Sequence, residues 1–172
     1  MTRFGPFLHI IQFVLFVLVQ GLLINEIDLG PNTHPLLHIL FILALPLELP
    51  VWLLMCIAFA YGVCIDTFTS TIGMHTSAMV LLAGARPIVL RLISPRDGYE
   101  PGQLPTISFM GIRWFLLYGA IMTLIHHIWY FFIEKMSFAD AGDTLMRILL
   151  SSLATLILMI ITQYLFFRLA RR

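Results

Sequence analysis

The chain has 172 residues, of which 60% are apolar and 11% are charged, with ten Lys and Arg against nine Asp and Glu. Soluble domains average about 45–50% apolar and about 25% charged residues, so this chain has too few charged groups to coat a water-facing surface. The composition excludes a soluble globule and a disordered chain, and the near-neutral charge gives no basis for nucleic-acid binding. What remains is a multi-pass membrane protein. At about 20 residues a span, there is room for roughly six spans.

The apolar stretches predict an all-α membrane protein with about six transmembrane helices in a single domain covering residues 1–172. In chain order the spans lie at 7–24, 35–45, 51–65, 78–93, 111–133 and 144–167. The first is too long for the core of a signal peptide and is expected to be retained. Polar loops containing Gly and Pro separate the spans, and the longest of them covers 94–110.

The second and third spans, 35–45 and 51–65, are the shortest. Each is short for a hydrocarbon layer of about 30 Å. Pro46 and Pro50 would break a helix that ran from one span into the other. The sequence leaves two arrangements open, which are two short spans in a hairpin or one span and one re-entrant segment.

The distribution of basic residues predicts the orientation in the membrane. With six spans and both termini in the cytoplasm, the cytoplasmic side receives eight of the ten basic residues, as the positive-inside rule requires. The opposite side keeps only Lys135 and Arg147. Five spans would move Arg3 outside, so six spans are expected. The eight cytoplasmic residues are Arg3, Arg86, Arg91, Arg96, Arg113, Arg168, Arg171 and Arg172.

Polar side chains inside the first span form one narrow stripe. His9, Gln12 and Gln20 fall within an arc of about 80° on a helix. Polar groups in hydrocarbon normally face the interior of a bundle. The stripe is therefore either a hydrogen-bonding seam between helices or the wall of a polar cavity.

The fifth span carries Thr123, His126, His127 and Tyr130. His126 and His127 point about 100° apart on a helix, which argues against both binding one metal ion. No H-E-x-x-H motif is present. The aromatic run 129–132 predicts an anchor at the membrane–water interface. No metal ligands and no cofactor are expected here.

The third span carries Ala58, Gly62 and Asp66 at helical spacing, which predicts a small-residue groove for a neighbouring helix. Asp66 could cap the following turn or the next helix, or pair with a basic residue of a partner. With His75 it could also form a proton or cation site. Glu48, between two prolines, is either a solvated turn acid or part of a tip that a partner recognises.

Catalytic signatures are absent from the sequence. It has no G-x-S-x-G, no P-loop, no Gly-rich dinucleotide turn and no carboxylate pair on one helix face. Ser151 or Ser152 with a distant histidine would be the one candidate for serine hydrolysis, but with Thr155 these residues are more typical of small-residue helix packing. We therefore expect a protein that is not an enzyme.

The segment GVCIDTFTSTIGMHTSA at 62–78 resembles the G-x-x-x-D and following G-x-x-x-x-A segment of MreD, a small membrane protein of the bacterial rod-shape machinery. Gly62, Asp66, Gly73 and Ala78 carry most of this resemblance. ARP at 85–87, with Arg86, and GYEP at 98–101, with Tyr99 and Glu100, are also similar. The resemblance extends over essentially the whole chain.

This resemblance implies a non-enzymatic scaffold in the bacterial inner membrane. The implied partners are an MreC-like protein, with MreB, RodA and a penicillin-binding transpeptidase in the wider complex. The implied fold is a compact bundle similar to the substrate-binding subunits of energy-coupling-factor transporters. A binding subunit of a small-molecule importer is therefore the alternative function. The Ala58–Gly62–Asp66 groove is expected to hold the partner, the 94–110 loop to dock one, and the arginine tail at 168–172 to hold anionic lipid.

Overall fold

The computed structural model describes residues 5–136 and 141–167, and every regular element in these ranges is helical. In chain order the elements are α1 (Gly5–Leu22), η1 (Ile24–Glu26), α2 (Ile39–Ala44), α3 (Val51–Thr69), α4 (Met74–Leu92), α5 (Ile107–Met110), α6 (Ile112–Lys135), α7 (Ala141–Thr162) and η2 (Gln163–Phe167). A short turn joins α3 to α4, a longer loop at 94–106 follows α4, and residues 23–50, which contain α2, connect α1 to α3.

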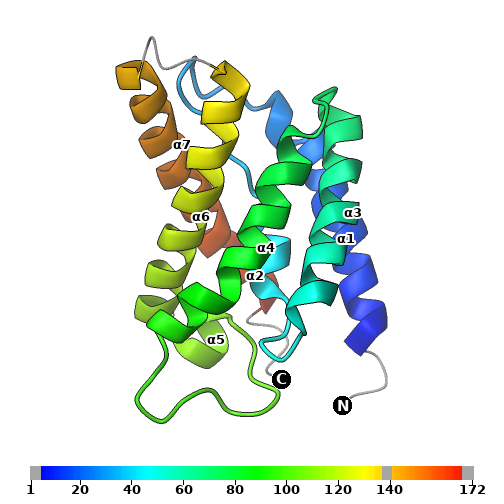
Figure 1. The fold of residues 1–172 in the computed structure, drawn as a ribbon, viewed down its shortest axis with the longest axis vertical. Helices are drawn as coiled ribbons and strands as arrows, with labels where there is room; N and C mark the ends of the chain where they lie inside the picture. The colour runs from blue at the N-terminus through cyan, green and yellow to red at the C-terminus, as the bar shows by residue number, and fades with distance from the viewer. Residues whose placement is uncertain (1–4, 137–140, 168–172) are drawn as a thin grey trace.

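The five long helices run along the long axis of the molecule and surround α2 (Figure 1). Neighbours pack in the order α1, α3, α4, α6 and α7, and α2 contacts α1, α4 and α6. We call one end of the bundle the lower end, where α1 begins and where the 46–50 turn and the 94–106 loop lie. The opposite, upper end carries the α3–α4 turn and the connection from α1 toward α2.

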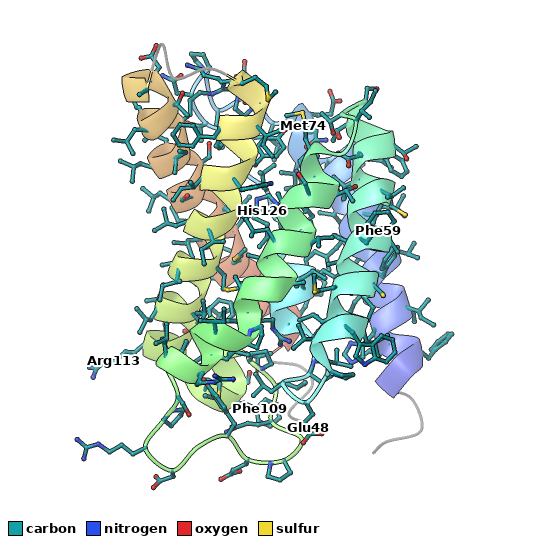
Figure 2. All side chains as sticks on the ribbon, viewed as in Figure 1. Glu48, Phe59, Met74, Phe109, Arg113 and His126 are labelled. Carbon is teal, nitrogen blue, oxygen red and sulfur yellow. The ribbon has the colours of Figure 1, made fainter. Side chains whose placement is uncertain are left out.

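Four of the described helices are long and apolar enough to cross a membrane, namely Phe7–Glu26, Val51–Thr69, Ile112–Lys135 and Ala141–Phe166. They also expose large apolar side chains, for example Ile10 (62%), Trp52 (68%) and Leu153 (58%). In Figure 2, Phe59 likewise points outward from α3. Continuous apolar exposure of this kind is unfavourable in water and fits hydrocarbon. The architecture is therefore compatible with a membrane protein.

The predicted span at 35–45 contains only the six-residue helix α2, which rises about 9 Å. This helix is too short to be the predicted membrane-spanning helix. Every α2 side chain is at most 6% exposed, so the apolar run reflects burial inside the bundle. The chain instead descends through the interior from the upper end, first without regular structure and then as α2 (Figure 1).

The neighbouring predicted span at 51–65 is longer in the structure than expected. Helix α3 continues through Asp66 to Thr69, giving 19 residues and about 28 Å, enough for the hydrocarbon core. Helix α4 begins at Met74, four residues before its predicted start at 78. The spans predicted at 7–24, 111–133 and 144–167 correspond to α1, α6 and α7 with its π-helical continuation.

Candidate functional site

A segment without regular secondary structure, residues 33–36, leads into α2. Its backbone is satisfied by hydroxyl groups of α7. The His34 N–H donates to Ser151 Oγ at 2.9 Å, and the Leu36 N–H donates to Thr155 Oγ1 at 2.9 Å. Non-helical backbone at membrane depth is tolerated only where the protein supplies such partners. These two hydroxyls therefore hold the segment, in addition to the helix packing that the sequence predicted for them.

Gln20 of α1 secures the same segment from the opposite side. Its Oε1 accepts the His38 N–H at 3.1 Å, and its Nε2 donates to Pro35 O at 3.2 Å. The other two members of the predicted stripe, His9 and Gln12, bond to each other at 3.0 Å. The stripe is therefore neither a single seam nor a single cavity wall, because its members bond to different partners.

Helices α3 and α4 meet at Gly62. A Cβ atom added to Gly62 would lie 2.4 Å from the Cα of Thr76, so only glycine fits. Ala58 and Ala78 are both fully buried. The Ala58–Gly62–Asp66 groove thus exists as predicted, but α4 of the same chain fills it. Helix α4 therefore occupies the position that the sequence analysis expected an MreC-like partner to take.

Asp66 caps the start of α4. Its carboxylate accepts the N–H groups of His75 and Thr76, both at 3.0 Å. The same carboxylate also accepts the Thr71 hydroxyl at 2.7 Å. Gly73, with φ +76°, makes the turn that brings these donors round. This is one of the interpretations that the sequence left open, and it places His75 in the first turn of α4.

We expect Asp66→Asn to destabilise the protein by about 2 kcal/mol, because an amide nitrogen would face N–H groups that the carboxylate now accepts. Thermal unfolding of the purified protein in detergent measures the effect. Asp97→Asn, on the exposed 94–106 loop, is the matched control and should melt like the wild type. Equal melting temperatures for the two variants would contradict the capping role.

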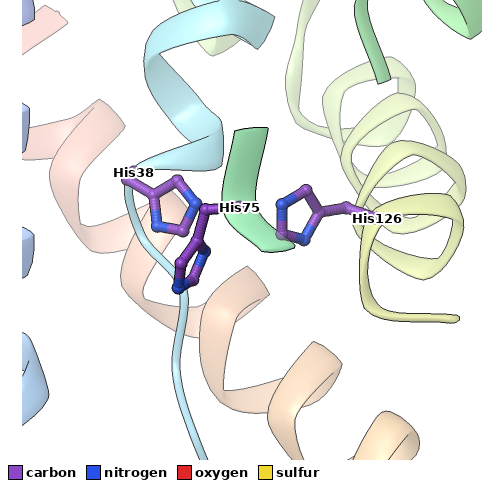
Figure 3. Close-up of side chains that lie close together, drawn as sticks. All are labelled: His38, His75 and His126. Atoms are coloured by element: carbon purple, nitrogen blue, oxygen red, sulfur yellow. The ribbon is translucent and has the colours of Figure 1, made fainter. Parts of the chain in front are cut away.

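The upper half of the bundle interior contains three histidines that face one another: His38, His75 and His126 (Figure 3). One ring nitrogen from each lies within 4.8 Å of the others. The ring centroid of His38 is 5.0 Å from that of His75 and 5.5 Å from that of His126. None is more than 2% exposed. We call these three residues the histidine cluster.

Most nitrogens of the histidine cluster have no hydrogen-bond partner among the described residues. This applies to both ring nitrogens of His38 and His126 and to Nδ1 of His75. His127, the neighbour of His126, is not a member of the cluster, although its ring centroid lies only 5.7 Å from that of His126. Its Nδ1 donates to Thr123 O at 2.9 Å. The arrangement is thus a set of unused imidazole donor atoms in an apolar interior.

A cavity of about 360 Å³ at the upper end reaches His75, the one member of the cluster among its lining residues. His75 and Tyr130 line it, and the Tyr130 ring centroid lies 4.5 Å from that of His75. The exposed acids Glu26 and Glu134 also belong to its wall. The remaining lining residues are Gly21, Ile24, Asn25, Ile27, His34, Pro35, Leu36, Phe68, Thr69, Thr71 and Phe131.

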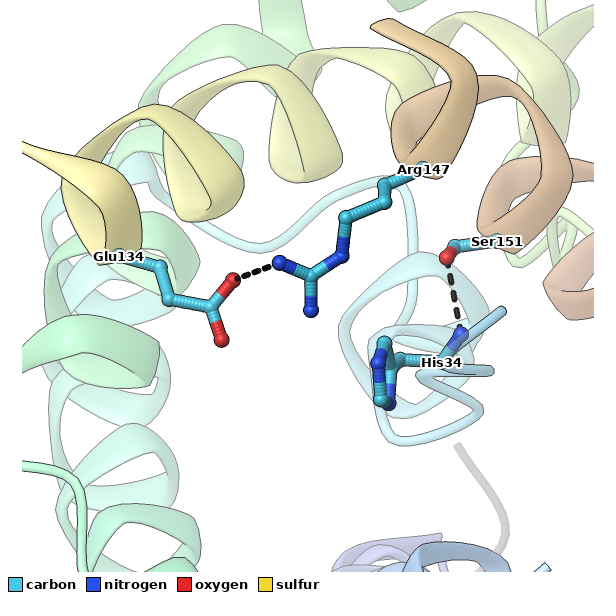
Figure 4. Close-up of polar contacts among 4 residues, drawn as sticks. All are labelled: His34, Glu134, Arg147 and Ser151. Carbon is cyan, nitrogen blue, oxygen red and sulfur yellow. Dashed lines mark hydrogen bonds and ion pairs between the residues drawn. The ribbon is translucent and has the colours of Figure 1, made fainter. Parts of the chain in front are cut away.

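An ion pair in this region joins α6 and α7. Glu134 Oε2 lies 3.3 Å from an Arg147 guanidinium nitrogen (Figure 4). The guanidinium also lies 5.2 Å from the centroid of the Phe131 ring. Tyr130 and Phe131 are 8% and 1% exposed, so these two members of the predicted interfacial aromatic belt instead face the interior. Trp129, 42% exposed, does lie on the surface.

Arg86 is buried at the lower end of the interior, not exposed at the cytoplasmic surface as the orientation argument assumed. It is 2% exposed and donates to the carbonyl groups of Leu43, Leu45 and Pro46. Its Nε donates to the Tyr118 hydroxyl at 2.9 Å. A helix leaves its last carbonyls without partners, and Arg86 satisfies those at the end of α2. Its role is structural.

The 94–106 loop is ordered by contacts with the body of the protein. The Gly102 N–H donates to Glu48 Oε1 at 2.8 Å, and the Tyr99 hydroxyl donates to Leu90 O at 2.7 Å. Partial burial raises the pKa of Tyr99, so this donor persists at neutral pH. Glu48 and Glu100 remain exposed. We call the 46–50 turn and the 94–106 loop together the lower loop surface.

No protein-family model, curated protein or solved structure matches this chain. The fold alone therefore defines the class, an all-helical protein with four helices able to cross a membrane. Within the described ranges, the structure brings His126 together with His38 and His75, which the sequence did not associate. Arg3 and the tail predicted to hold anionic lipid, 168–172, lie outside the described residues.

Proposed function

We propose that this protein is a non-enzymatic scaffold of the bacterial cell-elongation machinery, similar to MreD, in the cytoplasmic (inner) membrane. One observation supports the proposal most. The residues that carry the resemblance form one structural unit, in which Gly62 permits the α3–α4 contact, Asp66 caps α4 and Gly73 makes the turn. Ala78 is buried in the same unit. The resemblance thus falls on residues that depend on one another.

In this proposal the chain crosses the membrane six times and the lower end faces the cytoplasm. The five long helices and the segment containing α2 would supply the crossings. Arg91, Arg96 and Arg113 are exposed, and Figure 2 shows Arg113 extending outward from the lower part of the bundle. Exposed arginines at one end favour a cytoplasmic position for it. A bundle similar to energy-coupling-factor substrate-binding subunits remains part of the proposal.

The proposed docking site for the elongation partners is the lower loop surface. The Ala58–Gly62–Asp66 groove is filled by α4, whereas Glu48, Glu100 and Arg96 are exposed on ordered backbone. An ordered loop loses little conformational entropy on binding. We assign an MreC-like protein as the direct partner, with MreB, RodA and a penicillin-binding transpeptidase in the wider assembly.

The cavity at the upper end favours a second candidate function, the substrate-binding subunit of a small-molecule importer. Its volume of about 360 Å³ falls at the low end of the range for small-molecule sites. His75, Tyr130 and Thr71 would offer polar contacts to a solute there.

Depletion of the protein in a rod-shaped host tests the proposal. The scaffold function predicts that depleted cells become round while uptake of small solutes is unchanged, and that the wild-type gene restores the rod shape. Depleted cells that keep their rod shape would contradict the proposal. Loss of uptake of one solute, without a change of shape, would instead support the importer.

A further inference from the structure

We propose that His38, His75 and His126 together bind one transition-metal ion of the Zn²⁺ type in the bundle interior, beside the upper cavity that His75 lines. Imidazole nitrogen is a preferred ligand of Zn²⁺, and three histidines with an open fourth position form a known type of zinc site. The proposal is independent of the scaffold function. It concerns residues that come from three separate elements and that no sequence motif connects.

The imidazole nitrogens of the histidine cluster are available as metal ligands. Five ring nitrogens of the histidine cluster are buried and have no partner among the described residues. Leaving a buried polar group unpaired is costly, at about 1–3 kcal/mol a group. A metal ion accepts one lone pair from each neutral imidazole and so removes three of these deficits at once. Isolated core histidines would not be expected to converge in this way.

The three ligand nitrogens lie almost close enough together to bind one ion. The three ligand nitrogens already lie within 4.8 Å of one another, whereas a tetrahedral zinc with bonds of about 2.0–2.1 Å needs them about 3.4 Å apart. Side-chain rotation can close the difference, because the backbones of the three residues are held independently. Gln20 fixes His38, Asp66 fixes His75, and His126 lies within the continuous helix α6.

The histidine cluster lies beside an open cavity and near negatively charged side chains. His75, though not His38 or His126, lines the cavity that opens at the upper end, and this cavity gives an ion a route to that side of the cluster. Glu26 is an exposed acid on the wall of that cavity, while Glu134 is already paired with Arg147. Asp66 accepts the His75 backbone N–H and supplies negative charge beside the site. A dication would then be partly neutralised in an apolar interior.

Metal binding at this position would join the α2 segment, α4 and α6. Because an ion that binds the folded state and not the unfolded chain stabilises the fold increasingly as the free ion concentration exceeds its Kd, the intact protein should melt at a higher temperature with Zn²⁺ than without it. The ion would therefore hold the start of α2, through His38, against α4 and α6.

The test uses the full chain, purified in detergent with an affinity tag that lacks histidine and stripped with a chelator. We expect one Zn²⁺ per chain by elemental analysis, a raised melting temperature, and the visible absorption of tetrahedral nitrogen-ligated Co²⁺ when cobalt replaces zinc. His38→Gln, His75→Gln and His126→Gln should each weaken Zn²⁺ binding at least tenfold. His127→Gln, which changes the adjacent buried histidine outside the cluster, should bind like the wild type.

The wild-type protein keeps the test decisive even if a variant fails to fold. A stripped wild-type chain that takes up less than a tenth of an equivalent of Zn²⁺ and gives no tetrahedral Co²⁺ spectrum would overturn the proposal. Equal weakening by His127→Gln and by His126→Gln would overturn it too. Failure here would leave the scaffold function standing, because rod shape and partner capture are measured separately.

Discussion

Gly62→Ala is expected to destabilise the protein by about 3 kcal/mol or more, since the added methyl group must displace backbone and not a movable side chain. The Cβ atom would lie 2.4 Å from the Thr76 Cα and 2.9 Å from the Thr76 nitrogen. Helices α3 and α4 must move apart, and this movement also stretches the hydrogen bonds that the first turn of α4 donates to Asp66. The loss should therefore exceed that of a typical buried substitution.

Gly84→Ala is the matched control for this prediction. Gly84 also lies inside α4, but beyond its own stretch of helix no described atom lies within 4 Å of the position that its added methyl group would take. Alanine there should stabilise the helix by roughly 0.5–1 kcal/mol, because glycine is a poor helix former. Thermal unfolding in detergent should thus shift in opposite directions for the two variants. A Gly62→Ala protein that melts with or above the wild type would contradict the α3–α4 contact described above.

Arg86→Met is the second substitution with a large expected effect. It removes the donors for the carbonyl groups of Leu43, Leu45 and Pro46 while keeping most of the side-chain volume. Leu43 O keeps the Tyr118 hydroxyl as a donor and Pro46 is part-exposed, so the loss falls mainly on Leu45 O, and about 1–3 kcal/mol is expected. Arg86→Lys should recover part of this loss, because an ammonium group can reach fewer of the acceptors.

Arg91→Met provides the control for Arg86. Arg91 lies in the last turn of the same helix and is exposed, so its replacement should change stability by no more than about 0.5 kcal/mol. Limited proteolysis of the 46–50 turn reports on the same change, because α2 should detach from the lower end when Arg86 is lost. Equal melting and equal cleavage for both variants would contradict the role of Arg86 in holding α2.

The helical class and the long apolar helices could be predicted from the sequence. Long apolar runs identify α1, α6 and α7 because each exposes one side to an apolar surrounding and buries the other. The Ala58–Gly62–Asp66 groove also correctly predicted that a helix packs closely against α3. Its partner could not be predicted, since small residues at helical spacing fit a helix of the same chain and a helix of another chain equally well.

The segment without regular secondary structure, residues 33–36, and the histidine cluster could not be predicted. A short apolar run does not distinguish a short span from a buried turn, and the groups that satisfy the segment, Gln20, Ser151 and Thr155, come from distant helices. From the sequence, His126 could be related only to its neighbours along the fifth predicted span. His38 and His75 approach it only because α2 lies inside the bundle and because Asp66 fixes the start of α4.

The central claim, a membrane scaffold for cell elongation, is tested most directly by crosslinking in intact membranes. A photo-activatable residue in place of Glu100, on the exposed lower loop surface, would capture whatever binds there. Mass spectrometry would then identify both captured proteins and retained small molecules. We predict an MreC-like protein or the RodA–transpeptidase pair. Capture of a transport ATPase, together with a small solute held in the upper cavity, would contradict the scaffold and identify an importer subunit.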